Sequence, residues 1–214
     1  MSESNDSLRP AARIFCIARN YAEHAKEMGN AIPSEPVIFM KPASSMVGVG
    51  EPLKVPKAQG LVHHEMELVV MLGRQGSEIP VQSAREHVAK VTLGIDLTLR
   101  DVQNRLKKAG HPWELCKSFD GSAVIGDFIE WPRQSDIQNI DMQCRVNGSL
   151  RQQGNTRDML FPVAQIIAFL SRHWRLLPGD LIYTGTPAGV GPLIAGDRIE
   201  IESPQIGRFG WNVA

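Results

Sequence analysis

The sequence predicts an α+β fold that is mainly β, a mixed β-sheet sandwich or roll with a few peripheral helices. Short apolar runs bounded by Gly and Pro recur along the 214 residues. Helical periodicity is confined to three or four stretches, and strands and helices do not alternate regularly as βαβ units would. The Asn-Gly pair at residues 147–148 is the usual signal of a tight hairpin, so some strands should pair antiparallel.

In the first half of the chain, apolar and β-branched runs predict strands, and polar or Gly residues mark the helix ends. Asn20 and Gly29 are placed to cap the two ends of a short helix. Ser83 and Glu86 have the spacing of a capping box over the next helix. The expected strands are 13–17, 37–40, 61–72 and 91–100, and the expected helices are 21–28, one ending at 90, and 101–109.

The second half of the chain contains the best amphipathic helix, whose apolar residues share one stripe over residues 161–174. Strands are expected on both sides of the Asn-Gly hairpin, after Pro178-Gly179, and at the carboxyl end of the chain. We expect residues 11–214 to form a single catalytic domain behind a disordered head of residues 1–10. The expected strands are 142–146, 149–151, 180–183, 197–201 and 207–213.

Composition narrows the class of partner. The chain has 23 basic and 23 acidic residues and a pI near 7. It therefore lacks the excess positive charge that is typical of proteins that bind nucleic acid or an anionic membrane. No apolar run approaches membrane-spanning length, and the polar amino-terminus resembles no targeting segment. Three widely spaced cysteines without a Cys-x-x-Cys pattern favour a reducing cytoplasm. Small molecules, or further copies of the chain, are the expected partners.

Two carboxylates stand two positions apart in the apolar run 61–72. Because strand side chains alternate between faces, Glu65 and Glu67 should point the same way, with Met66 and Leu68 on the other face. A half-exposed strand whose glutamates face water would give the same pattern. Asp96, at the centre of a second apolar strand, supplies a third carboxylate. If the three converge, a divalent cation is one partner that would satisfy them together.

A candidate base lies on the first helix. His24 and Glu27 are three residues apart and therefore neighbours on one face, so Glu27 could orient the imidazole or raise its basicity. A solvated polar helix with an incidental histidine is the alternative.

Six motifs follow one another along the chain: Arg19-Asn20-Tyr21 with His24 and Glu27, Lys41-Pro42, His63-His64-Glu65-Met66-Glu67, Asp96 with Arg100-Asp101 and Gln103, Lys117 with Asp120, and Thr184-Gly185-Thr186-Pro187 with Gly189 and Gly191. In this order they resemble the fumarylacetoacetate hydrolase family, and more narrowly its short single-domain branch, which includes acylpyruvases and enzymes acting on oxaloacetate. The resemblance covers nearly the whole chain and implies the fold of that family's carboxyl-terminal domain.

The resemblance implies roles for these residues. Glu65, Glu67 and Asp96 match metal ligands, usually for Mg²⁺ and sometimes for Mn²⁺ or Ca²⁺, which their hard oxygens suit. Lys117 matches a lysine that neutralises a developing enolate, although a lysine is ordinarily a surface residue. Four further positions are expected to bind substrate: Arg19, Arg100, Gln103 and Thr186.

Two of these substrate-binding assignments have alternatives. Arg100 could instead be a structural ion-pair partner of Asp101 or Glu67. The turn that carries Thr186 could be no more than a tight β connection, although such turns can offer backbone N–H groups and a hydroxyl to a carboxylate.

The activity expected from the resemblance is metal-dependent hydrolysis of acylpyruvates, which are 2,4-dioxo acids, with cleavage of a carbon–carbon bond to give pyruvate and a carboxylic acid. The oriented His24 would activate the water. Alternatives on the same site are an oxaloacetate keto–enol tautomerase or decarboxylase and an isomerase of the 2-hydroxyhepta-2,4-diene-1,7-dioate type. A non-enzymatic binding protein on the same fold is a further alternative, against which the intact ligands, base and lysine speak. The family also suggests a homodimer.

Overall fold

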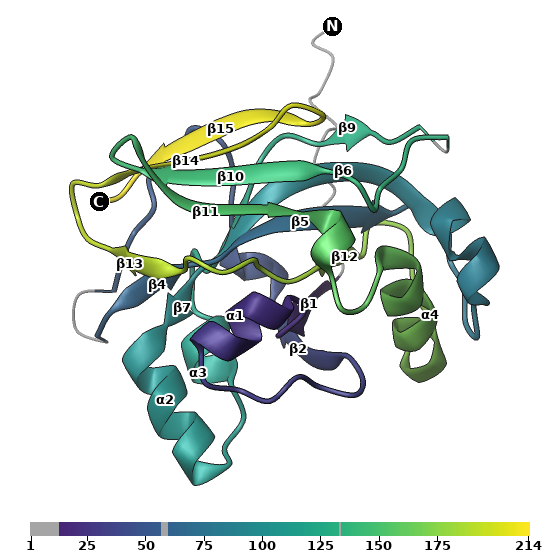
Figure 1. Ribbon diagram of the computed structural model, residues 1–214, viewed down its shortest axis with the longest axis horizontal. Coiled ribbons are helices and arrows are strands. Elements are labelled where there is room, and N and C mark those ends of the chain that lie inside the picture. The colour runs from purple at the N-terminus through teal and green to yellow at the C-terminus, as the bar shows by residue number, and fades with distance from the viewer. Residues whose placement is uncertain (1–12, 57–59, 133) are drawn as a thin grey trace, which may run out of the picture.

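The computed structural model describes residues 13–56, 60–132 and 134–214 (Figure 1). The disordered head predicted for residues 1–10 lies outside the described residues. The fold is mainly β, as the sequence predicts, with strands in sheets of eight, four and three. The strands are β1 (Ile14–Ala18), β2 (Val37–Lys41), β3 (Met46–Val47), β4 (Val62–His64), β5 (Met66–Leu72), β6 (Val88–Asp96), β7 (Thr98–Leu99), β8 (Ala123–Ile125), β9 (Ile129–Glu130), β10 (Asp141–Val146), β11 (Ser149–Asn155), β12 (Leu181–Tyr183), β13 (Gly191–Leu193), β14 (Arg198–Ser203) and β15 (Gly207–Asn212).

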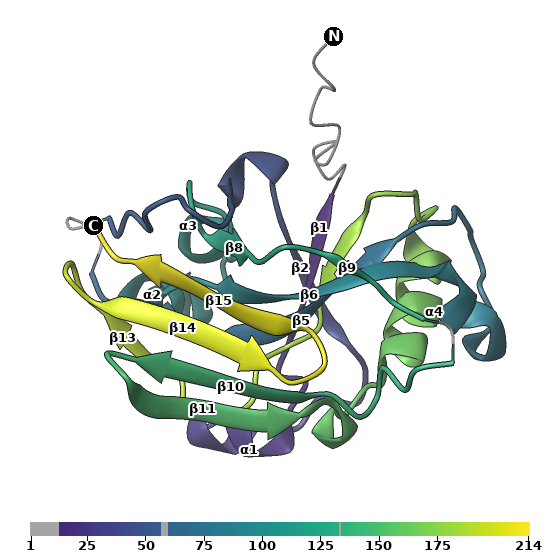
Figure 2. The ribbon, with the colours of Figure 1, turned by 90° about the horizontal axis from the view of Figure 1, so that it is seen from above.

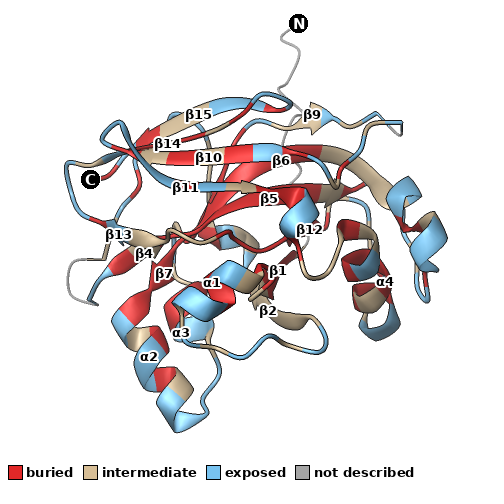
Figure 3. Cartoon of the chain, viewed as in Figure 1, coloured by how far each residue is buried: buried red, intermediate tan, exposed pale blue. Residues whose placement is uncertain are grey.

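The eight-stranded sheet is mixed. Its order is β2-β1-β12-β5-β6-β8-β3, with β9 added beside β6. The pairs β1·β12 and β3·β8 are parallel, and the other pairs in this sheet are antiparallel. Strands β5 and β6 lie at its centre, and Figure 3 shows them largely buried.

The four-stranded sheet, in the order β11-β10-β14-β15, covers one face of the large sheet (Figures 1 and 2). The main core lies between the two sheets, because Met66 and Leu68 of β5 share one apolar cluster with Met142 and Cys144 of β10. The predicted hairpin joins β10 to β11, and the positive φ angles of Asn147 and Gly148, 51° and 77°, fit the predicted turn.

The opposite face of the large sheet carries a smaller apolar cluster. Val69 of β5 packs there with Cys16 of β1 and Tyr183 of β12. The alternation along β5 therefore sends its even-numbered residues into the main core and its odd-numbered residues to this second face. Glu67 stands on the second face, two residues before Val69, so the candidate site lies away from the four-stranded sheet.

The helices lie at the periphery (Figure 1). The predicted amphipathic helix is present as α4 (Val163–His173), and the helix before Gly110 is present as α2 (Arg100–Ala109). The helix predicted from Ser83 and Glu86 is wrong: η2 (Val81–His87) is a 3₁₀ helix that follows Pro80 without a side-chain cap, and β6 already begins at Val88. Pairing of Val88 with Leu72 of β5 prevails over the local capping pattern. The helical elements are α1 (Ala22–Glu27), η1 (Ala43–Ser45), η2 (Val81–His87), α2 (Arg100–Ala109), α3 (Glu114–Lys117), η3 (Thr156–Asp158) and α4 (Val163–His173).

Asn20 does not cap the first helix as predicted. The residue before α1 is Tyr21, and it makes no side-chain cap. The buried Asn20 amide instead donates to the carbonyl oxygens of Phe161 and Thr184, at 3.1 and 2.7 Å, and accepts from the Phe161 N–H at 2.7 Å. Asn20 thus connects the start of α1 to two distant loops and fixes where that helix lies.

Candidate metal centre and active site

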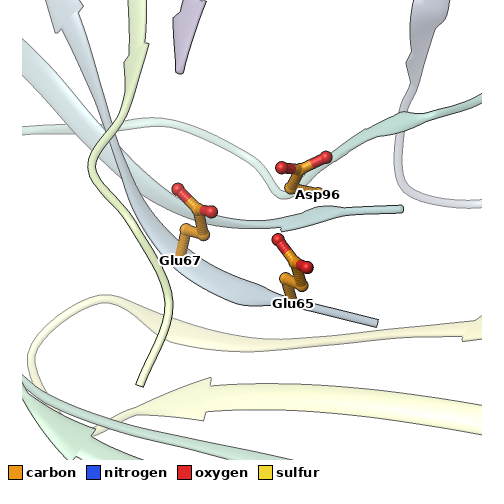
Figure 4. Close-up of side chains that lie close together, drawn as sticks. All are labelled: Glu65, Glu67 and Asp96. Carbon is orange, nitrogen blue, oxygen red and sulfur yellow. The ribbon is translucent and has the colours of Figure 1, made fainter. Parts of the chain in front are cut away.

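Three buried carboxylates converge on the second face of the large sheet. Glu65, Glu67 and Asp96 each offer an oxygen atom, and these three atoms lie within 4.8 Å of one another. Figure 4 shows the side chains turned toward a common point. Their exposed fractions are 5%, 2% and 1%, which excludes the alternative that the glutamates face water.

Strand register explains the convergence. The predicted strand 61–72 is interrupted at Glu65, which links β4 to β5. Glu65 lies two residues before Glu67, so the two side chains are on the same face. The Asp96 N–H donates to the Glu65 carbonyl oxygen at 2.8 Å, so the end of β6 lies beside Glu65. Opposite Glu67 the partner residue is Gly94, where a Cβ atom would come within 3 Å of neighbouring atoms. Two adjacent central strands and one strand junction therefore supply the three acids.

Buried cations surround the carboxylates. The Lys117 ammonium donates to Glu65 Oε2 at 2.7 Å, to Asp96 Oδ2 at 2.6 Å and to the Thr98 hydroxyl at 2.6 Å. Lys41 Nζ lies 2.8 Å from Asp96 Oδ1 and donates to the Lys117 carbonyl oxygen. Lys117 is 2% exposed, so the alternative of a surface lysine is wrong.

The charges shift the pKa values of the acids in opposite directions. Burial alone would raise the pKa of Glu65, but the Lys117 and Arg100 charges prevail and hold that pKa below its usual range. Burial, followed by the charges of Asp96 and Glu65, raises the pKa of Glu67 well above its usual value. The Gly185 N–H, which donates to Glu67 Oε2 at 2.6 Å, only partly opposes this rise. Glu67 is therefore the carboxylate whose charge is least compensated.

The donor set fits a hard divalent cation. All three side chains are carboxylates, and no sulfur belongs to the group. Asp96 Oδ1 is buried and accepts no well-aligned hydrogen bond within the described part of the chain, although the Lys41 ammonium lies 2.8 Å from it. A cation among the three acids would offset the burial and the repulsion that raise the pKa of Glu67, and would give Asp96 Oδ1 a further partner.

Arg100 forms an ion pair, but with neither of the partners considered from the sequence. Its guanidinium donates to Glu65 Oε1 at 2.6 Å and to Gln103 Oε1 at 2.5 Å. Asp101 instead accepts a hydrogen bond from the Leu61 N–H. Arg100 and Gln103 do line the pocket above the triad. Their observed contacts hold Glu65 in place, and substrate binding by these two residues stays a prediction.

The candidate base has the geometry expected of it. His24 Nδ1 lies 3.1 Å from Glu27 Oε2, and His24 is 7% exposed, so the alternative of an incidental solvated histidine does not hold. The other carboxylate oxygen of Glu27 accepts a hydrogen bond from the Gly189 N–H at 3.0 Å. Gly189 has φ of +97°, and a Cβ atom there would collide with the Arg151 carbonyl oxygen. Glu27 therefore orients His24 and also ties α1 to the Gly-rich turn.

The hydroxyl of Thr186 is already committed within the protein. It donates to the Met66 carbonyl oxygen at 2.7 Å and accepts from Gln152 Nε2 at 2.7 Å. Gln152, which the sequence did not indicate, also accepts from the Met66 N–H and contacts His64 through its oxygen. Thr186 does line the pocket, and its role in substrate binding stays a prediction. Gln152 fixes both sides of the strand junction that bears Glu65.

The pocket over the triad is nearly filled in this conformation. Its free volume is about 30 Å³, which has room for a water molecule or two but not for a 2-oxo acid. Arg19 lines it, together with Met28, Asn30 and Lys107, and substrate binding by Arg19 stays a prediction. A larger hollow, about 1140 Å³, lies over β10, β11 and β14 and contains none of the triad. We assign the site by its chemistry and not by its volume.

Sequence reasoning gave no role to two charged residues, Lys41, which it named only as part of a motif, and Lys107, which it did not name. Lys41 ends an apolar strand, and a lysine in that position is a sign of a buried partner that could have been noticed. Lys107 stands in a run of basic residues on α2, where nothing in the local sequence distinguishes it from its exposed neighbour Lys108.

No helix in the described ranges is long and apolar enough to span a membrane.

Comparisons with known proteins agree with this geometry. Residues 13–214 match the family model described as fumarylacetoacetate (FAA) hydrolase C-terminal. The oxaloacetate tautomerase YcgM of Escherichia coli is 43% identical over 90% of this chain and 88% of its own length. The mitochondrial oxaloacetate decarboxylase of Dictyostelium discoideum is 42% identical over 88% of this chain and 87% of its own.

A solved structure shares the fold and carries ligands. The crystal structure of fumarylpyruvate hydrolase from Pseudomonas aeruginosa, in complex with Mn²⁺ and pyruvate, superposes with a TM-score of 0.92 at 37% sequence identity. The match covers 99% of this chain and 93% of that one.

Proposed function

The chain belongs to the fumarylacetoacetate hydrolase family, and from that premise we propose that it is a divalent-metal-dependent hydrolase of acylpyruvates. It would cleave the C3–C4 bond of a 2,4-dioxo acid to give pyruvate and a carboxylic acid. The observation that carries the proposal is one pocket that contains an all-carboxylate triad, a buried ammonium and an oriented imidazole.

In this proposal Glu65, Glu67 and Asp96 hold the cation. Mg²⁺ is the ion we favour, because carboxylate oxygens suit it, and Mn²⁺ and Ca²⁺ suit the same donors. When bound, the cation would supply a Lewis acid for the carboxylate and 2-oxo oxygens of the substrate. The relative from P. aeruginosa, with Mn²⁺ and pyruvate, supports both the ion class and the substrate class.

The chain's own residues would carry the proton steps. His24, oriented through Nδ1 by Glu27, takes a proton from water through its other nitrogen while the water oxygen attacks C4. The C3–C4 bond then breaks, and its electron pair forms the enolate of pyruvate. The positive charge of Lys117 stabilises this enolate. C3 takes up a proton, which balances the one that His24 removed, and pyruvate and the acid leave.

Oxaloacetate keto–enol tautomerisation is a second candidate, favoured by the name of the relative YcgM. It would use the same 2-oxo acid site and the same enolate stabilisation by Lys117. The difference is that only a proton moves at C3, so no water attacks and His24 would serve as a proton carrier. The two functions therefore differ in the bond that changes and not in the groups around it.

Purified protein with Mg²⁺ is incubated separately with acetylpyruvate, enol-oxaloacetate and keto-oxaloacetate. Ultraviolet absorbance and the release of pyruvate, acetate and carbon dioxide are followed. Acetate and pyruvate in equal amounts from acetylpyruvate support the hydrolase. Fast enol-to-keto relaxation without carbon dioxide, and with acetylpyruvate untouched, would replace it by the tautomerase. Turnover that persists unchanged in EDTA would refute both.

Assembly and location are also part of the proposal. We expect a homodimer, on the basis of the family resemblance, and a solution mass by light scattering of twice the 23.6 kDa chain would agree. A cytoplasmic location is supported by the three cysteines, which are buried and unpaired. Fractionation of the native cells with an antibody to this chain tests the location.

A further inference from the structure

Gln152, on β11 of the four-stranded sheet, is a buried amide whose hydrogen-bonding capacity is fully used. Its oxygen accepts from the Met66 N–H at 2.9 Å and lies 3.0 Å from His64 Nδ1. Its nitrogen donates to the Thr186 hydroxyl at 2.7 Å and to the Pro187 carbonyl oxygen at 2.9 Å. A peptide N–H can only donate and a carbonyl oxygen can only accept, so these partners define the orientation of the amide. Gln152 is 1% exposed, and each end of the amide has two partners within the protein.

The oxygen end of the amide holds the backbone between two of the candidate ligands. Met66 separates Glu65 from Glu67. Its N–H donates to Gln152, and its carbonyl oxygen accepts from the Thr186 hydroxyl at 2.7 Å. Because Gln152 donates to that same hydroxyl, three hydrogen bonds close a ring beside the Met66 backbone. The placement of Glu65 relative to Glu67 therefore depends on a side chain that comes from the other sheet.

The nitrogen end of the amide holds the Gly-rich turn. Pro187 accepts from it, and two residues later the Gly189 N–H donates to Glu27 Oε1 at 3.0 Å. A Cβ atom at Gly189 would collide with the Arg151 carbonyl oxygen, so the turn lies directly against the β11 backbone next to Gln152. The turn thus connects Gln152 to Glu27, the carboxylate that orients the candidate base.

We propose that Gln152 is a positioning residue that couples the metal centre to the base. One amide sets the strand junction that carries two ligands against the turn that anchors Glu27. Gln152 is not one of the described residues that line the pocket, so it acts through these contacts and not on the substrate. The inference rests on the proposed function, because it assumes that the triad holds a cation and that His24 moves a proton. The opposing view is that Gln152 only joins β11 to the large sheet.

Three substitutions separate the two views. Gln152→Met keeps the length of the side chain and removes its hydrogen bonds. Gln152→Glu keeps two acceptor oxygens but can donate at most one hydrogen, and none when ionised, so it releases mainly the turn. Gln153→Met is the control, because Gln153 is the next residue of β11 and is exposed. Thermal unfolding of every variant identifies a temperature at which the compared proteins are folded.

Calorimetric titration of metal-free protein with Mn²⁺ tests the metal centre without turnover. Loss of a group that orients metal ligands ordinarily weakens metal binding by about 10- to 100-fold. Gln152→Met should raise the Kd of Mn²⁺ by about this factor, and Gln153→Met should leave it unchanged. Gln152→Glu should bind Mn²⁺ no more weakly than wild type, because its contacts with the strand junction persist.

A double-mutant cycle of Gln152→Glu with Glu27→Ala tests the base. The rate is measured at saturating Mn²⁺ with whichever of acetylpyruvate and enol-oxaloacetate the wild-type protein converts. Gln152→Glu alone should lower kcat/KM by about tenfold or more. In the Glu27→Ala background the turn no longer reaches the base, so Gln152→Glu should change kcat/KM by less than about twofold.

Unchanged Mn²⁺ binding in folded Gln152→Met would overturn the proposal and leave Gln152 a structural link. An unchanged kcat/KM in Gln152→Glu, or an equal loss with and without Glu27→Ala, would overturn it as well. If Gln152→Met does not fold, the cycle with Gln152→Glu decides alone. These results leave the proposed function standing, whereas a wild-type protein that binds no Mn²⁺ would overturn the proposed function and this inference together.

Discussion

Replacing Glu67 by Gln separates the electrostatics of the triad from its capacity to bind a cation. The amide keeps the volume of the side chain and an oxygen that can accept the 2.6 Å hydrogen bond from the Gly185 N–H. What is lost is one negative charge and one potential ligand oxygen. The change therefore leaves the packing of β5 intact, and the measured effect belongs to the charge.

The two consequences have opposite signs. In metal-free protein, burial and the Asp96 and Glu65 charges raise the pKa of Glu67. A raised pKa in the fold means that wild-type stability falls as pH rises from the unfolded-state value, about 4.3, toward the folded value. Glu67→Gln lacks this loss, so at pH 7.5 in EDTA it should be at least as stable as wild type.

The effect of the substitution on stabilisation by a bound cation should have the opposite sign. A cation at a concentration of 100 times its Kd stabilises the folded state by about 2.7 kcal/mol. For a domain of this size that corresponds to a rise in Tm of roughly 5–11 °C. Glu67→Gln leaves two carboxylates, Glu65 and Asp96, that are already engaged by Lys117, so most of this rise should disappear.

Differential scanning calorimetry at pH 7.5, in EDTA and with Mg²⁺ or Mn²⁺, measures both effects. Glu86→Gln is the matched control, because Glu86 pairs with Arg74 at the surface, where both side chains are about half exposed. A full metal-induced rise in Glu67→Gln would refute its role as a ligand. A metal-free variant less stable than wild type by more than about 1 kcal/mol, the worth of an ordinary hydrogen bond, would refute the account of its pKa.

Three further changes test other parts of the site. His24→Asn should lower kcat for acetylpyruvate by about 10²- to 10⁴-fold, the usual worth of a general base, and should leave the metal-induced rise in Tm unchanged; undiminished initial rates would contradict the base assignment. Asn20→Ala removes three hydrogen bonds of a buried amide and should cost about 2–4 kcal/mol in urea unfolding, whereas a loss below about 0.5 kcal/mol would mean that water replaces the amide. In EDTA, the lowered pKa of Glu65 contributes stability that is present above its unfolded value, about 4.3, and is lost as pH falls below it. Below about pH 4.3, unfolding midpoints should therefore drop more steeply in wild type than in Glu65→Gln; parallel curves would contradict the sign of the shift.

The features that follow from local alternation could be predicted from the sequence. Glu65 and Glu67 share a face because of the strand period. Asp96 joins them only because its strand pairs with theirs, and the family resemblance, not the alternation, indicates the complete triad. The hairpin at Asn147 and Gly148 depends on the same kind of local rule, since only certain residues accept positive φ at low cost.

The features that depend on distant partners could not be predicted in this way. Asn20 has the side chain of a helix cap, yet its partners lie 141 and 164 positions further along the chain. Ser83 and Glu86 have the spacing of a capping box, but the start of β6 is set by its pairing with β5. The buried ion pair of Arg100 with Glu65 spans 35 positions, and no pattern around either residue indicates the other.

The two oxygens of Glu27 have a consequence for the kinetics. One oxygen contacts His24 and the other accepts from Gly189, while the pocket beneath them has only about 30 Å³ of free space. A substrate can enter only if α1 or its neighbours move, and a shift of α1 away from the Gly-rich turn would break the Glu27 contact. Where access comes from movement of α1, an open pocket and an aligned imidazole are thus mutually exclusive states of that helix. The free energy needed to restore the closed state is drawn from substrate binding, so changes at Gly189 should raise KM more than they lower kcat.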